Sequence, residues 1–184
     1  MPPSKIRNAS LQYWPRKRAS RILPNANWNA LQKSLDKQKR KEVGVEGFIG
    51  YKVGMVSIFA KDLTPESMSK NKKIIIPASV VSCPKMKIYS VRFYKNGQVA
   101  KEVIVNWDKD LKAKARKPGK IEKLDFAKAG DYDDLRVLVY SKISEGGYKK
   151  SSDIIELALN GSKQDKEKFI QEKVSKEISV FDVF

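Results

Sequence analysis

Apolar residues gather in short runs between residues 47 and 106 of this 184-residue chain. The first run, GFIGYKVGMVSIFA, is rich in residues that favour strands and is broken by glycines. Two further strands are predicted at IIIPASVVSC and KIYSVRFYK, and the Asn96-Gly97 pair predicts a hairpin turn into the return strand QVAKEVIVNW. Several short strands with glycine corners favour a small barrel over an open sheet.

The pattern after residue 106 mixes strands with a helix. The basic segment DKDLKAKARKPGK predicts a loop or a short helix, and RVLVYSK and DIIELALNG predict strands at 136–142 and 153–161. Ser162, with Asp165 three residues on, is typical of a capping box, so we expect a helix over about 163–175.

The first 42 residues differ from the rest in charge. They carry 11 Lys and Arg against two acids, and show a weak helical pattern at 27–41. Such a segment cannot bury a core alone and takes its shape from a partner. We therefore expect a mainly β fold with α+β additions, in three parts. These are a basic extended arm at 1–46, the strands of an incomplete barrel at 47–106, and an α+β insert at 107–184 that ends in a strand.

The formal net charge of +17 indicates a polyanionic partner, since small domains usually carry a net charge of about 2–8 in magnitude. No apolar run approaches the roughly 18 residues that a membrane span needs, and the N-terminus lacks the apolar core of a signal peptide. A cytoplasmic nucleic-acid binder is therefore the favoured class. A membrane-surface protein is the weaker alternative, because it would need a long basic amphipathic helix.

The side-chain inventory argues against catalysis. The chain has no histidine and a single cysteine, Cys83, which removes Cys–His and Ser–His pairs and the usual zinc ligand sets. Asp131, Asp133 and Asp134 form a local acidic cluster that could bind a cation, but loops before strands more often use such residues for turns. We expect no enzymatic activity, no metal and no cofactor; an enzyme that acts on an acidic substrate is kept as an alternative.

The stretch YWPRKRAS at residues 13–20 is the leading candidate for RNA binding. Pro15 favours an extended chain, the three cations after it can neutralise phosphates, and the aromatic rings before it can stack on unpaired bases. A solvated tail, and for Lys52 an ordinary exposed strand lysine, are the alternatives. The candidate RNA-binding residues are Arg7, Tyr13, Trp14, Arg16, Lys17, Arg18, Arg21, Lys39, Arg40, Lys41 and Lys52.

The sequence stops on the apolar segment VFDVF. An unpaired apolar strand promotes aggregation unless something covers it. Either its side chains enter the core of this chain, or a second polypeptide continues the fold. For the second case the candidate partner-pairing residues are Val180, Phe181, Val183 and Phe184.

Two ordered motifs resemble the universal large-subunit ribosomal protein L-three family in its archaeal and eukaryotic form. ASLQYWPRKRA at 9–19 is similar to the family pattern Gly-Ser-Leu-x-Phe-x-Pro-Arg-Lys-Arg-Ala, with departures at Ala9 and Tyr13. GFIGYKVGMVSIF at 47–59 resembles its Gly-Phe-x-Gly-Tyr-Lys-x-Gly-Met-Thr-His segment, with departures at Val56 and Ser57. The segments at 134–139 and 177–184 resemble two further parts of the family, although Tyr140 stands where histidine is common.

The resemblance implies part of a translation-protein-type β-barrel and a structural role on the ribosome. It implies binding to large-subunit rRNA and to neighbouring ribosomal proteins, and a part in subunit assembly. It covers the N-terminal half of the family pattern, so we expect a separate chain that carries the C-terminal half, with a split gene and a truncated chain both open. The alternative is a stand-alone basic SH3-like nucleic-acid-binding module.

Overall fold

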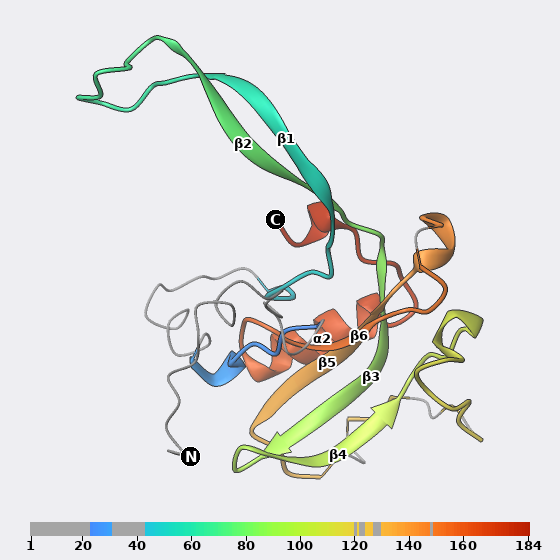
Figure 1. Cartoon of the computed structure of the whole chain (residues 1–184). Helices are drawn as coiled ribbons and strands as arrows, with labels where there is room; N and C mark the ends of the chain where they lie inside the picture. The colour runs from blue at the N-terminus through green and yellow to red at the C-terminus, as the bar shows by residue number, and fades with distance from the viewer. Residues whose placement is uncertain (1–22, 31–42, 120, 122–123, 127–129, 148) are drawn as a thin grey trace, which may run out of the picture.

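Two antiparallel sheets dominate the computed structural model, which describes residues 23–30, 43–119, 121, 124–126, 130–147 and 149–184 (Figure 1). One sheet has the order β4-β3-β5-β6, and the other pairs β1 with β2. The mainly β fold class is therefore confirmed. The strands are β1 (Tyr51–Lys61), β2 (Lys73–Ser82), β3 (Met86–Lys95), β4 (Gln98–Ile104), β5 (Asp134–Ser141) and β6 (Ile154–Ala158).

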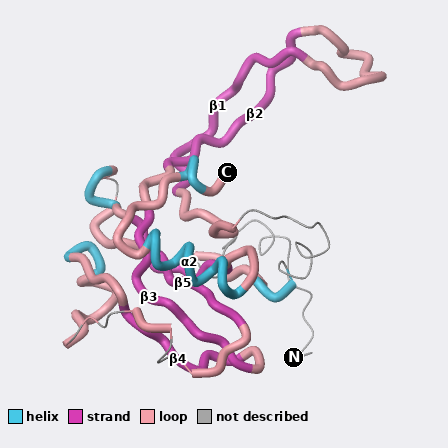
Figure 2. The backbone as a smooth tube through the Cα atoms, turned by 180° about the vertical axis from the view of Figure 1, so that it is seen from behind, coloured by secondary structure: helices cyan, strands magenta, loops and turns pink. Residues whose placement is uncertain are grey.

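The four-stranded sheet and one helix enclose the main core. Helix α2 (Lys163–Lys173) lies across one face of the sheet (Figure 2). Alternate residues of β3 and β5, among them Phe93 and Val137, point to this face and are fully buried in one cluster with Ile170 of α2. The opposite face carries a smaller cluster of Tyr89, Leu111, Leu138 and Tyr140. The sheet is thus covered on both faces.

The β1–β2 pair projects from this body as an arm (Figure 1). Its base is fixed by Tyr51, whose hydroxyl is 2.8 Å from Ser141 Oγ and donates to Asp153 Oδ2 over 2.8 Å. Beyond the base, large apolar side chains on both strands are exposed, and in the described part of the chain nothing packs over them. They are Val53, Met55, Val56, Ile58, Phe59, Ile75, Ile76, Val80 and Val81.

Turns and caps follow the sequence pattern closely. Asn96 and Gly97 both have positive φ, 50° and 76°, as a two-residue hairpin loop between β3 and β4 requires. The Ser162 hydroxyl accepts a hydrogen bond from Asp165 N over 3.4 Å at the start of α2. The predicted hairpin and helix are therefore confirmed.

The strands expected within 47–106 are present, and they are divided between two sheets. β3 pairs with β4 on one side and with β5 on the other. The four-stranded sheet therefore joins strands from 47–106 with strands from 107–184. The described residues form no closed barrel. The glycines before β1 permit close approaches within the protein: a Cβ at Gly50 would lie 2.7 Å from Val81 Cγ1.

The last five residues do not form the strand that their composition predicts. Val180–Asp182 is a 3-10 turn, because Ser179 N donates to Asp182 Oδ2 over 2.7 Å and Asp182 N donates to Ser179 O over 3.2 Å. Val183 packs against the main core, whereas Phe181 and Phe184 are 89% and 83% exposed. The proposed pairing of these residues with a second chain is not tested by this turn.

Candidate nucleic-acid interface

Most of the predicted RNA-binding residues lie outside the described residues. These are Arg7, Tyr13, Trp14, Arg16, Lys17, Arg18, Arg21, Lys39, Arg40 and Lys41. Lys52 is described, and its side chain is exposed on β1 near the base of the arm. Their role in binding therefore stays a prediction.

Two described pieces of the basic extension are attached to the β6 side of the body. Residues 28–30 are helical, and Trp28 is buried with its Nε1 donating to Glu156 O over 3.0 Å. Val45 is buried and bridges Leu159, and Glu46 N donates to Ala158 O over 3.0 Å. Described residues on both sides of the basic segment 31–42 are therefore attached to the body, and the extension adds Trp28 and Val45 to the main core.

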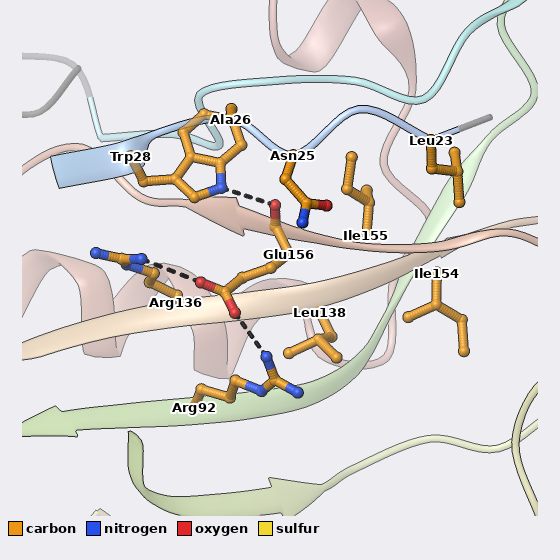
Figure 3. Close-up of a pocket in the computed structure, with 10 residues that line it drawn as sticks. All are labelled: Leu23, Asn25, Ala26, Trp28, Arg92, Arg136, Leu138, Ile154, Ile155 and Glu156. Atoms are coloured by element: carbon orange, nitrogen blue, oxygen red, sulfur yellow. Dashed lines mark hydrogen bonds and ion pairs between the residues drawn. The ribbon is translucent and has the colours of Figure 1, made fainter. Parts of the chain in front are cut away.

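A charged network lies next to Trp28 on the face of the sheet opposite α2 (Figure 3). Arg92 contacts Glu156 at 2.7 Å and Glu102 at 2.8 Å, and Arg136 contacts Glu156 at 3.1 Å. Burial raises the pKa of Glu156, but hydrogen bonds from Tyr94, Arg92 and Arg136 outweigh it and hold that pKa below its ordinary value of 4.5. The carboxylate is therefore ionised at neutral pH.

This network borders a cavity of about 330 Å³ lined also by Leu23, Asn25 and Ile155. Its cations are not available to a nucleic acid, because Glu102 and Glu156 already neutralise them. Arg136 also stacks on the Tyr94 ring, with its guanidinium carbon 4.3 Å from the ring centroid. We conclude that this site holds the sheet and the extension together, and that its two arginines are structural.

A second basic region, residues 107–119, was not among the predicted binding residues. Lys109–Leu111 forms a 3-10 turn, and Leu111 is fully buried against Tyr140. The Tyr140 hydroxyl donates to Asp108, and burial together with this bond raises the pKa of Tyr140. The sequence signal was present as five Lys and Arg within 109–117, but the N-terminal extension has the greater excess of charge.

The acidic cluster at 131–134 is used for structure. Asp133 accepts from Asn96 N over 2.7 Å, Asp134 contacts Lys166 at 2.7 Å, and Asp131 contacts Lys95 at 3.3 Å. Across the described ranges, no three His, Cys, Asp or Glu side chains gather in a way that could hold a metal ion. The helices in those ranges are also too short or too polar to cross a membrane.

Comparison with known proteins agrees with the resemblance of the motifs. Residues 1–118 match the family model of ribosomal protein L3. Large ribosomal subunit protein uL3 of Archaeoglobus fulgidus is 30% identical over 97% of this chain and 54% of its own length. The uL3 protein of Picrophilus torridus is 30% identical over 98% of this chain and 54% of its own. The chain thus spans about half the length of the curated relatives it matches, and it belongs to the ribosomal protein L3 family.

Proposed function

We propose that this chain is a structural constituent of the large ribosomal subunit that binds and positions rRNA in the cytoplasm. Membership of the ribosomal protein L3 family carries the proposal, and two relatives are named as large-subunit proteins. The net charge of +17 supports it, because packed RNA phosphates require cations to neutralise them. A ribosomal role also agrees with the expectation that the chain is not an enzyme.

The basic extension is proposed as the main contact. Arg16, Lys17 and Arg18 neutralise phosphates, and Tyr13 or Trp14 stacks on an unpaired base. The attachment of Trp28 and Val45 to the body supports this role, because it anchors described parts of the basic extension to the fold. Close packing of rRNA around the extension would then support subunit assembly.

Binding of the chain to deproteinised large-subunit rRNA across a salt series tests this function. We expect steep salt dependence, with a log–log slope of about −0.7 to −0.9 for each phosphate contacted. Replacing Arg16, Lys17 and Arg18 with Ala should reduce the slope by about 2 to 3 and leave the circular dichroism of the strands unchanged. An unchanged slope would return these three residues to the solvated-tail interpretation.

We also propose that the β1–β2 arm packs against strands from polypeptide outside these 184 residues. Apolar side chains are exposed on both faces of the arm: Phe59 opposes Ile75 on one face and Ile58 opposes Ile76 on the other. Isolated two-stranded hairpins are marginally stable in water, so a covering partner would stabilise the arm. That a separate chain supplies the strands, with Val180, Phe181, Val183 and Phe184 as pairing residues, stays a prediction.

Self-association of the isolated chain tests the arm proposal. Without its partner the chain should associate at micromolar concentrations, since exposed apolar strand surfaces bind one another. The double substitution of Phe59 and Ile75 by Ser should reduce this association in analytical ultracentrifugation, and the pair Ile58 and Ile76 provides the matched variant for the other face. A monodisperse wild-type monomer with a protected arm would contradict the proposal.

A further inference from the structure

We propose that residues 107–119 form a second RNA-contact surface, which binds the phosphate backbone of folded RNA independently of the N-terminal extension. The inference rests on the proposed rRNA-binding function and adds to it a surface on a different part of the fold. The segment contains five cations, Lys109, Lys112, Lys114, Arg116 and Lys117, and two carboxylates.

The segment is held in place by the body before any ligand binds. Leu111 is fully buried beside Leu138 and Tyr140 on the sheet. Ser152 N donates to Asp110 O over 3.3 Å, and Ala115 N donates to Leu111 O over 2.8 Å. Binding therefore costs little backbone ordering, which is the advantage of a preformed surface.

Three of its cations differ from the sheet arginines because they make no ion pair with a described carboxylate. Within the described ranges, no ion pair joins Lys109, Lys112 or Arg116 to a carboxylate, whereas Arg92 and Arg136 each contact Glu156. Lys114 reaches Asp153 only at 3.8 Å. The charge on this segment is therefore available for an anion, and the charge on the sheet face is not.

The arrangement of the side chains suits RNA. Lys112 N donates to Lys109 O over 3.1 Å, and residues three apart in such a turn lie on the same side. Lys117 lies over the Trp107 ring at 5.9 Å. Leu111 is fully buried and Trp107 is half-buried, so the segment keeps little apolar surface that could enter a bilayer, as membrane binding would require. Phosphates of folded RNA are the partner that matches this surface.

The test compares two sets of charge-removing substitutions of equal size. The segment variant changes Lys109, Lys112, Arg116 and Lys117 to Gln. The control variant changes Lys163, Lys168, Lys173 and Lys176 to Gln, in and just after helix α2, which covers the opposite face of the sheet. The affinity of the wild-type chain and of each variant for deproteinised large-subunit rRNA is measured across a salt series. Affinity for phosphatidylserine vesicles is measured in parallel.

We expect the segment variant to lose at least tenfold in rRNA affinity and about 3 from the log–log salt slope, with a smaller change in the control. The inference would be overturned if the two variants lost equal affinity for rRNA. It would also be overturned if the segment substitutions weakened binding to vesicles more than binding to rRNA. If the wild-type chain binds rRNA with a steep salt dependence, and the segment variant has the same affinity and slope, only this inference fails. If the wild-type chain does not bind rRNA, the proposed function fails with it.

A measurement on the unsubstituted protein removes any dependence on variant folding. Lysine acetylation followed by mass spectrometry should show Lys109, Lys112 and Lys117 protected when rRNA is bound, while Lys168 on α2 stays reactive. Protection of Lys168 without protection of the segment would overturn the proposal.

Discussion

The body sheet and the arm are built from similar residues and differ in what covers them. In β5 every residue from Leu135 to Ser141 is buried, whereas in β1 Phe59 is 78% and Val53 is 69% exposed. The body has α2 on one face and the 107–119 segment on the other; the arm has no such layer among the described residues. Strand-forming residues therefore predict strands in both regions, but the packing layers decide which region supplies stability.

Truncation of a phenylalanine should separate the two regions most clearly. Phe93 is fully buried and meets Tyr132 edge to face at 5.0 Å between centroids, so Phe93→Ala should lower the free energy of unfolding by about 3–5 kcal/mol. Phe59→Ala on the arm should cost less than about 1 kcal/mol. Urea unfolding followed by circular dichroism measures both, and similar losses would mean that the arm is packed as a core.

The polar face of the body should show an intermediate, pH-dependent effect. Glu156→Gln removes the shared partner of Arg92 and Arg136 and should cost about 2 kcal/mol at pH 7. Because the pKa of Glu156 is lowered in the fold, its carboxylate stabilises the protein above the ordinary pKa of 4.5, and this contribution is lost as the pH falls. The difference between wild type and variant in urea unfolding should therefore shrink below that pH. A difference that grows on acidification would contradict the assignment.

The junction of arm and body should show the smallest effect. Tyr51→Phe removes the hydrogen bonds to Ser141 and Asp153 and should cost about 1 kcal/mol. Hydrogen exchange should quicken in β1 and β2 and stay unchanged in β3 and β5. Tyr89→Phe, on the body sheet, is the matched control and should leave exchange in the arm unchanged.

Local features were predictable where the signal is local. The Asn96-Gly97 turn requires positive φ that these residues tolerate, and the Ser162 cap satisfies backbone donors close in sequence. The assignment of strands to sheets was not predictable, because the pairing of β3 with β5 joins residues about 50 apart in sequence. The residues of either strand do not indicate which strand it pairs with. The C-terminal turn was missed because VFDVF has strand composition, while one Asp182 carboxylate closes a capping interaction.

The site was predictable in charge and less so in geometry. The excess of Lys and Arg predicts a polyanionic partner, but it does not say which cations already have partners. Arg92 and Arg136 are neutralised by Glu156, which lies 64 and 20 residues away in sequence. Leu111 fixes the 107–119 segment by packing against Leu138 and Tyr140 of β5. This contact depends on the folded sheet and could not be predicted from the segment itself.

Sedimentation of native lysate on a density gradient, with quantitative mass spectrometry of the fractions, tests the central claim most directly. We predict that the chain travels with the large ribosomal subunit in a one-to-one ratio with other large-subunit proteins and leaves it only at high salt. A chain that stays at the top of the gradient at low salt would contradict a ribosomal role and favour a stand-alone nucleic-acid-binding module.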